Sequence, residues 1–481
     1  MKTFLLCCLF SFAIDSLAVN PGVRIQANQN ALTYMKSIGM KILNGKVRGV
    51  RVPDLSGSHG EFSYSLTNIR ITSFSAPDSQ ASITLHDPNQ ITTHLSVSTN
   101  VDADYHLRLG HGWVHISKSG SVTASASGAP SVTTGLLTSN GKPQVKLVSC
   151  SGNVEVNNLH FHGDLFDQIA NLFEHYIKDY INGKLRGVVC DQLSSVVRDD
   201  ANAYLKKMPT SVSVKDGFGI DYSLVGNPVV QHNNVVSFGM LGKVFYQGHQ
   251  NDPKIPQAQP TPVVTGSSKM VCINLDAEEV IGSAGYALVV SGKAHLLVDK
   301  SQLGKLAPMM ACSCSSSCIG KIIPQIQSKC AAGGTVNMAL SLSQAPVVQV
   351  NTSGAFISLT GQVKFVAALP NGQQVSLFTV AANAAAVLPS PVTFKDWTIT
   401  GQVHVTGASM KVTSSQVGKI DEQGLNQIWQ MVLVLVVEQE LNKVAAKGIP
   451  LPQIPDLQVL QPDLAFSDHR LALCFNAKYT G

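Results

Sequence analysis

The sequence predicts an α+β fold in which two similar halves form one elongated molecule. Three observations support this prediction. Each half begins with a short helical pattern, continues through strand-like alternation and ends in a longer helical pattern. A segment at 248–262 has four prolines within ten residues and divides the chain almost equally. One helical pattern is longer than a compact half could contain.

Composition indicates a folded protein that does not bind nucleic acid. The chain has 481 residues, of which 44% are apolar and 14% are charged. This excludes a disordered, highly charged chain, because there is enough apolar surface to build cores. The net charge of +5 and the aromatic content of 6% are too low for a surface that binds phosphates with cations and stacks aromatic side chains on nucleic-acid bases. We therefore expect no nucleic-acid partner.

Residues 1–18 have the pattern of a secretory signal peptide. One lysine precedes an apolar run that reaches Ile14, and small residues stand at Ser16 and Ala18. The run is too short for the ~20 apolar residues that a bilayer requires. We expect cleavage after Ala18 and secretion. The remaining chain divides into a first half at 19–247, a proline-rich linker at 248–262 and a second half at 263–481.

The first half contains two predicted helices around strand-like segments. Apolar residues at helical spacing predict a helix over 31–43, followed by strand-like alternation. A second pattern runs from 164 to 208 and stops at Pro209, with bends expected at Gly183 and Gly187. Such a helix would be ~67 Å long at 1.5 Å per residue. The molecule should therefore be elongated.

The second half repeats this plan. A short helix is predicted over 277–290, and strand-like alternation follows it. A longer helix is predicted over 421–447, and Gly448 and Pro450 are typical of a helix end. Each half should thus consist of a short helix, a twisted antiparallel sheet and a long helix.

Eight cysteines follow the signal peptide. If the halves fold separately, Cys150 and Cys190 have only each other, and closing that loop would stabilise by roughly 4 kcal/mol. Six cysteines in the second half cannot be paired from sequence. Four of these are clustered, at Cys312, Cys314, Cys318 and Cys330. Their spacing differs from a paired C-x-x-C zinc site, so disulfides are favoured over a metal.

No motif indicates catalysis or a cofactor. His160 and His162 would lie on one strand face, but spacing nominates no third metal ligand, which favours a solvent-facing pair. The sequence contains no G-x-S-x-G, H-E-x-x-H or Walker pattern. We expect no enzyme activity, no cofactor and no metal. Asn351 begins an N-x-S/T sequon, which predicts a glycosylated surface loop.

Several short segments resemble one protein family. They occur in the family's order and span nearly the whole mature chain, at 20–25 (NPGVRI), 51–54 (RVPD), 68–71 (NIRI), 219–225 (GIDYSLV) and 448–452 (GIPLP). The chain is similar to the bactericidal/permeability-increasing and lipopolysaccharide-binding protein family, which includes plasma lipid-transfer proteins. Cys150 and Cys190 fall where the family's shared disulfide would lie.

The resemblance implies a boomerang of two barrel-like domains joined by a central sheet. It also implies two apolar tunnels, each holding a phospholipid between the long helix and the sheet. We expect a secreted, lipid-binding monomer, and the resemblance implies an antibacterial or innate immune role. Its expected partner is phospholipid, with lipopolysaccharide or an anionic membrane surface as a further candidate. The alternative is a recognition or structural protein of this fold whose tunnels are filled by side chains.

The apolar faces of the two first-half helices nominate the lipid-binding residues. These are Leu32, Met35, Leu172, Tyr176 and Tyr180. Any amphipathic helix buries such a stripe, so an ordinary core is the competing interpretation. The unbranched, flexible methionine suits a wall that adapts to acyl chains.

A basic segment nominates an anionic-lipid surface. No acidic residue occurs between Val19 and Pro53, and five basic residues of the segment are Lys36, Lys41, Lys46, Arg48 and Arg51. We expect them at the tip of the first half, although a solvated helix face would show the same pattern. The family's lysine-rich hairpin is missing, because 87–121 has two basic residues, three acids and four histidines. Endotoxin binding therefore stays open.

Overall fold

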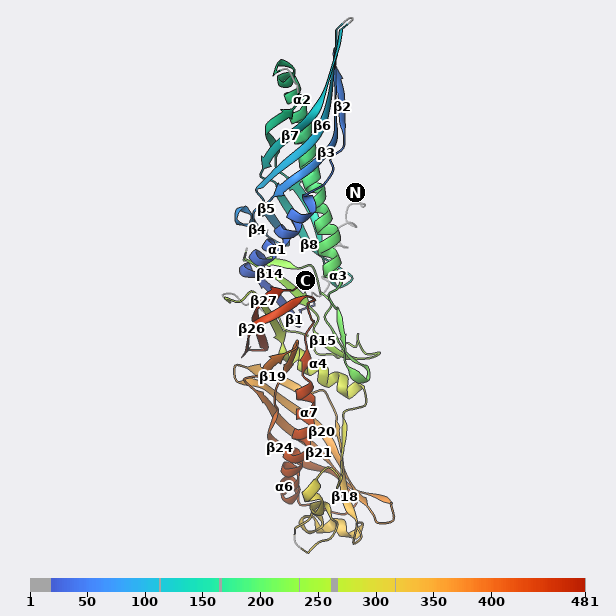
Figure 1. The fold of residues 1–481 in the computed structure, drawn as a ribbon. Coiled ribbons are helices and arrows are strands. Elements are labelled where there is room, and N and C mark those ends of the chain that lie inside the picture. The colour runs from blue at the N-terminus through green and yellow to red at the C-terminus, as the bar shows by residue number, and fades with distance from the viewer. Residues whose placement is uncertain are drawn as a thin grey trace, which may run out of the picture.

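The computed structural model describes residues 19–111, 114–163, 167–232, 234–260, 267–315 and 317–480. They form an elongated molecule whose two halves lie end to end on either side of a central sheet (Figure 1). The predicted signal peptide lies outside the described residues. Within the described ranges, no helix combines the length and apolar character needed to cross a bilayer.

A six-stranded antiparallel sheet joins the halves. Its order is β13-β14-β1-β16-β27-β26. The first half supplies β1 (Val23–Asn28), β13 (Val229–Gln231) and β14 (Val235–Met240). The second half supplies β16 (Val271–Asp276), β26 (Leu457–Ser467) and β27 (Arg470–Tyr479). Each half therefore begins with a strand, and not with a helix as the sequence suggested.

The central sheet has one apolar and one polar face. Val23 and Ile25 of β1 pair with Leu275 and Ile273 of β16, and these four side chains belong to one buried cluster. The alternate positions carry buried polar groups, and Asn274 donates to the side chain of Gln26 across the β1–β16 pair. Strand side chains alternate between the two faces of a sheet, so the apolar residues of β1 and β16 lie on the same face. These residues form one core that is shared by the two halves.

The first half is built from two further antiparallel sheets. One has the order β10-β7-β6-β3-β2 and the other β4-β5-β8-β9. Their strands are β2 (Leu55–His59), β3 (Phe62–Ser75), β4 (Ser82–His86), β5 (Gln90–His94), β6 (Val97–His111), β7 (Val114–Gly128), β8 (Ser131–Ser139), β9 (Lys142–Ser151) and β10 (Val154–His162). Over the described strands, both sheets stay open and do not close into barrels.

Two helices pack on these sheets. Helix α1 is Gln29–Val47, longer than predicted at both ends. Helix α2 (Asp167–Ser195) continues through a π-helical turn at Val196–Ala201 into α3 (Asn202–Lys206). Gly183 and Gly187 lie inside α2 without interrupting it, so the departure from α geometry is at the π turn instead. The predicted long helix is confirmed over its described part.

The second half repeats a strand, a short helix, a sheet and a long helix. Helix α4 is Ala277–Val290, as predicted. The sheet contains β17 (His295–Val298), β18 (Thr335–Leu342), β19 (Val347–Asn351), β20 (Gly354–Ala368), β21 (Gln374–Pro389) and β24 (His404–Ser415). Helix α6 (Glu422–Val432) continues through a π turn at Leu433–Val437 into α7 (Glu438–Lys447). Both long helices thus contain a π turn.

Smaller elements complete the fold. Two three-stranded sheets consist of β11 (Ser211–Ser213), β12 (Phe218–Asp221) and β15 (Lys243–Tyr246), and of β22 (Thr393–Lys395), β23 (Thr398–Thr400) and β25 (Ile449–Pro450). Short helices that the sequence did not predict are η1 (Asp78–Gln80), η3 (Lys215–Gly217), η4 (Gly304–Met310), α5 (Ile319–Ile322) and η5 (Pro324–Ser328). The last three cover the far end of the second half (Figure 1).

The proline-rich linker is packed against the protein. Ile255 and Ala258 are buried. The side chain of Asn20 donates to the Ala258 carbonyl at 3.1 Å, and the Gln259 N–H donates to Asp276 at 2.8 Å. The described part of the linker is therefore held by both halves and is not a free spacer. The predicted elongated α+β architecture with two repeated halves is otherwise confirmed.

Candidate lipid-binding site

The interior of the first half lies between α2 and the sheets. Five residues of α2 recur at helical spacing and are almost fully buried: Phe173, Ile177, Ile181, Leu185 and Val189. Helix α1 contributes Met40, Leu43 and Val47 to the same cluster. The pair of helices therefore forms an apolar interior, as expected of a wall that could face acyl chains.

The predicted α1 residues are not part of this interior. The Met35 side chain is 61% exposed, so the expectation that it lines a tunnel is wrong. Leu32 is buried, but in a separate cluster with Leu85, Leu136 and Val230. The reason is that α1 carries apolar residues on more than one face, so periodicity did not identify the buried one. The spacing of Met40, Leu43 and Val47, at three and four residues, was the sequence signal for the buried face of α1.

The predicted α2 residues are spread along the helix. Tyr176 is half-buried and stacks on Tyr64, with ring centroids 5.8 Å apart. The Tyr180 hydroxyl donates to the Pro53 carbonyl at 2.9 Å. Burial, and then the nearby Asp54 charge, raise the pKa of Tyr180. The side chain of Leu172 lies outside the described residues. The structure therefore does not gather the five nominated residues into one wall.

An apolar hollow that the sequence did not indicate lies in the second half. Its empty volume is about 290 Å³, a figure that includes space open to solvent. Its walls come from η4, α5 and α6, and its lining residues are Leu303, Met309, Met310, Ile322, Ile428, Met431 and Val432. Three methionines make this wall adaptable, because the side chain is unbranched and flexible. The adjacent Met309–Met310 pair was the signal available in the sequence.

A smaller hollow lies near the far end of the first half. It has about 210 Å³ of empty volume and is lined by Phe62, Leu107, Leu109, Ile116 and Lys118. Phe62 and Tyr64 also contact Phe173 of α2 edge-on, with ring centroids 5.7 and 5.2 Å away. Each half thus has an apolar hollow at the end remote from the central sheet.

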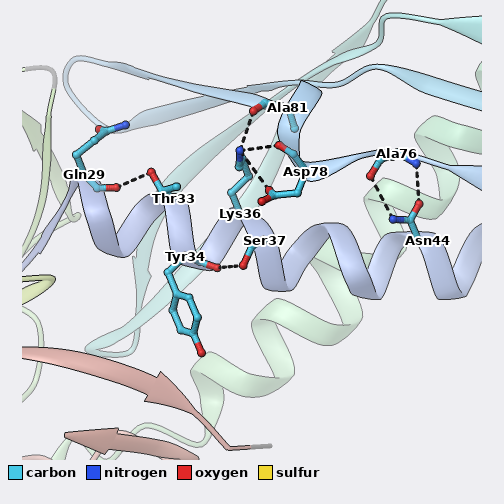
Figure 2. Close-up of polar contacts among 9 residues, drawn as sticks. All are labelled: Gln29, Thr33, Tyr34, Lys36, Ser37, Asn44, Ala76, Asp78 and Ala81. Carbon is cyan, nitrogen blue, oxygen red and sulfur yellow. Dashed lines mark hydrogen bonds and ion pairs between the residues drawn. The ribbon is translucent and has the colours of Figure 1, made fainter. Parts of the chain in front are cut away.

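The basic segment is not a free cationic tip. Figure 2 shows Lys36 of α1 held by the Asp78 carboxylate at 3.2 Å and by the Asp78 and Ala81 carbonyls at 2.9 and 2.8 Å. Lys46 forms an ion pair with Asp200. Two of the five predicted anionic-lipid residues are therefore already paired with acids brought in by the fold. Lys41, Arg48 and Arg51 remain exposed.

The position of this segment also corrects the prediction. Helix α1 lies between the central sheet and the middle of the first half, whereas the β6–β7 hairpin forms the tip (Figure 1). Asn44 fixes the helix to the adjoining loop, donating to the Ala76 carbonyl at 3.2 Å and accepting from the Ala76 N–H at 2.7 Å (Figure 2). The segment therefore cannot supply the tip cations that the sequence suggested.

All eight cysteines in the described part of the chain form disulfides. Cys150 of β9 pairs with Cys190 of α2, which is the link that the resemblance implies. The other pairs are Cys272–Cys474, Cys312–Cys330 and Cys314–Cys318. The four clustered cysteines are thus used in two disulfides. Among the residues that the structure describes, no group of three or more His, Cys, Asp or Glu side chains is arranged to hold a metal ion.

Known proteins share this sequence pattern and fold. The LBP / BPI / CETP family matches with its N-terminal domain over residues 31–199 and its C-terminal domain over residues 212–479. A bactericidal permeability-increasing protein of Sebastes schlegelii is 26% identical over 99% of this chain and 100% of its own length. A lipopolysaccharide-binding protein of Bos taurus is 23% identical over 100% and 98%.

Two further comparisons agree. A phospholipid transfer protein of Mus musculus is 26% identical over 74% of this chain and 70% of its own length. The crystal structure of lipopolysaccharide binding protein superposes with a TM-score of 0.59 at 19% identity, over 96% of this chain and 100% of that one. This likeness concerns the fold. The repeated halves, the central sheet and the matches to both domains establish that this chain belongs to the LBP / BPI / CETP family.

Proposed function

We propose that this protein is a secreted lipid-binding protein that holds the acyl chains of phospholipid or lipopolysaccharide inside each half. The observation that carries the proposal is the apolar interior between a long helix and a sheet, which occurs twice. Burial of a 16-carbon chain would supply on the order of 10 kcal/mol without any charged site. The relatives named for lipopolysaccharide binding and phospholipid transfer support the same class of ligand.

Other features are consistent with a secreted, non-enzymatic role in defence against bacteria. Asn351 is exposed at the end of β19, next to the turn that leads to β20, where a glycan could be attached. The exposed residues Lys41, Arg48 and Arg51 remain candidates for contact with anionic lipid. Neutral replacement of these three should weaken binding to anionic vesicles, measured by flotation. Unchanged binding would make them a solvated helix face.

The alternative is a recognition protein of the same fold without lipid transfer. One observation favours it: the two hollows are small, since their empty volumes of about 290 and 210 Å³ include space open to solvent. Lipid extraction from the purified protein followed by mass spectrometry separates the two functions. Lipid carriage predicts bound phospholipid in fixed stoichiometry, up to one molecule per half. Lipid-free protein would support the alternative.

A cavity-filling variant locates the bound lipid. Met431→Trp should fill the methionine-lined hollow at an overpacking cost of roughly 1–3 kcal/mol and expel the lipid of the second half. Val444→Trp is the matched control, because Val444 is 67% exposed on α7 of the same long helix. Lipid per mole should fall in the first variant and stay constant in the second. Equal lipid content in both folded variants would place the site elsewhere.

A further inference from the structure

We propose that the outer face of the five-stranded sheet in the first half docks on anionic phospholipid membranes when the pH falls. The central residues are His106 on β6 and His160 and His162 on β10, here called the histidine face. Strand β7 lies between β6 and β10. This surface lies outside the apolar interior, so the inference goes beyond the proposed function and does not depend on it.

The strand register brings the three imidazoles onto one surface. His106 lies opposite Ser119 of β7, and His162 and His160 lie opposite Ser121 and Thr123. The His106 Nδ1 atom is 2.7 Å from the Ser119 hydroxyl. The His160 and His162 rings are 4.5 Å apart. All three side chains are exposed, so a flat membrane surface could reach them together.

Other charges around this face nearly balance. Strand β6 presents Asp102, Asp104 and Arg108 beside His106, and Arg70 of β3 lies opposite Asp102. Asp104 accepts a hydrogen bond from Asn68 at 2.8 Å. Glu155 lies on β10, and α2, packed along β10, carries the pairs Glu174–Lys178 and His175–Asp179. With neutral imidazoles, the face therefore has no excess of cations to attract phosphate.

Protonation would reverse the charge of the whole sheet region. Residues 55–162, which span β2 to β10, contain five basic residues, six acidic residues and eight of the chain's 14 histidines. Their formal charge is −1 with neutral imidazoles and +7 with all eight charged. Seven of these histidines are exposed, and the side chain of His111 is outside the described residues.

The remaining chain lacks this property. Residues 263–481 contain only three histidines, His295, His404 and His469. Imidazole is the side chain whose ordinary titration falls between pH 5 and 8. Ten of the 14 histidines lie in 19–247 and three in 263–481, so added positive charge would fall mainly on the first half. Each cation near an anionic bilayer strengthens binding to it. This attraction is electrostatic, so salt weakens it. The predicted partner is therefore a membrane rich in acidic phospholipid, met under acidic conditions.

Vesicle flotation tests the proposal with the mature full-length protein. The vesicles are phosphatidylcholine alone or an equimolar mixture with phosphatidylglycerol, at about pH 7.5 and about pH 5.5. Binding to the mixed vesicles should strengthen by roughly 100-fold or more at the lower pH and should disappear in high salt. Equal binding at both pH values, or equal enhancement with phosphatidylcholine alone, would overturn the proposal.

Variants assign the effect to the histidine face. Replacement of His106, His160 and His162 by glutamine should weaken acid-induced binding by roughly 100-fold, as expected for three lost cations. The matched control replaces His249, His295 and His404, which are also exposed. An acid response that survives the first set of changes, or is lost equally in the control, contradicts the assignment. Lipid per mole should be unchanged in both, which keeps this test separate from that of lipid carriage.

Discussion

At the scale of single residues, the most unusual group is a carboxylate buried where the halves meet. Glu279 in the first turn of α4 is 5% exposed. Burial, and then the charge of Asp276, raise the pKa of Glu279 to about 8. Asp276 caps the same helix by accepting from the Glu279 N–H at 3.0 Å, and it also holds the linker at Gln259. The joint between the halves therefore contains a carboxyl group that prefers its proton.

The raised pKa predicts that stability falls as the solution becomes alkaline. The folded protein keeps a proton on Glu279 that the unfolded chain releases near pH 4.5. Its contribution to stability is thus present at low pH and lost as pH rises through about 8. Glu279→Gln keeps the shape without the ionisation. The variant should remove on the order of 5 kcal/mol of the loss between these pH values.

Thermal melting at several pH values checks this prediction. The exposed Glu440→Gln serves as the control, since Glu440 lies on α7 and pairs only at the surface with Lys443. Its melting temperature should change with pH in the same way as that of the unchanged protein. A slope of melting temperature against pH that is the same with and without Glu279 would show that this carboxyl group is not protonated in the fold.

Residue roles were the part of the site that sequence reasoning predicted least well. Lys36 and Lys46 stand in a segment without acids, but Asp78 and Asp200 reach them from elements distant in sequence. Met35 and Met40 have the same side chain five positions apart, yet one is exposed and the other buried. Such differences depend on which neighbours the fold supplies, and local periodicity does not contain that information.

At the scale of elements, the helices of the second half were predicted well because their ends carry local signals. Asp276 and Asp421 accept hydrogen bonds from the first turns of α4 and α6. Gly448 ends α7 with a φ of 70°, a conformation that favours glycine. The short helices η4, α5 and η5 were missed because they carry no extended apolar period: η4 directly precedes the loop closed by Cys312–Cys330, and α5 and η5 lie inside it.

The long helices are fixed to the sheets by asparagine side chains. Asn202 of α3 accepts from the Val145 N–H and donates to the Val145 carbonyl, both at 2.8 Å. Asn442 of α7 does the same with Val403, at 2.7 and 2.9 Å. Each asparagine side chain thus forms the two hydrogen bonds that a neighbouring strand would otherwise form with the backbone of the edge residue. The helices therefore cover exposed strand backbone in both halves.

Removal of such a link should destabilise the protein measurably. Asn202→Ala leaves the Val145 N–H and carbonyl without these partners, and Asn202 itself is only 8% exposed. We expect a loss of about 2 kcal/mol in the free energy of unfolding, measured by chemical denaturation. Asn158→Ala on the exposed face of β10 is the control and should change little. Similar losses in both variants would argue against a role of the link.

At the scale of the whole molecule, duplication and elongation followed from the residue pattern, whereas the central sheet was expected only from the family resemblance. Strands β1 and β16 are six residues each and stand directly before helices, so their patterns are short. Their pairing joins residues about 250 positions apart, for example Ile25 with Ile273. Contacts of such long range are invisible to local patterns. Local patterns alone therefore indicated two separate halves, whereas the two halves share one sheet.

The shared sheet predicts that neither half folds alone. Expressed separately, 19–247 would expose the edge of β1 and 263–481 the edge of β16, together with the apolar cluster of Val23, Ile273 and Leu473. An unpaired apolar edge of this kind promotes aggregation. Each half should therefore be insoluble or unfolded by circular dichroism, and the two should form a one-to-one complex when produced together.

A chain cut within the linker supplies the control for this last prediction. A protease site inserted between Gln250 and Asn251, which are both exposed, leaves the strands of the central sheet intact. Since β1 and β16 hold the halves together directly, the cut protein should elute as one particle in gel filtration and melt in one transition. If either half unfolds cooperatively as a monomer, the central sheet is a contact between finished domains rather than a shared core.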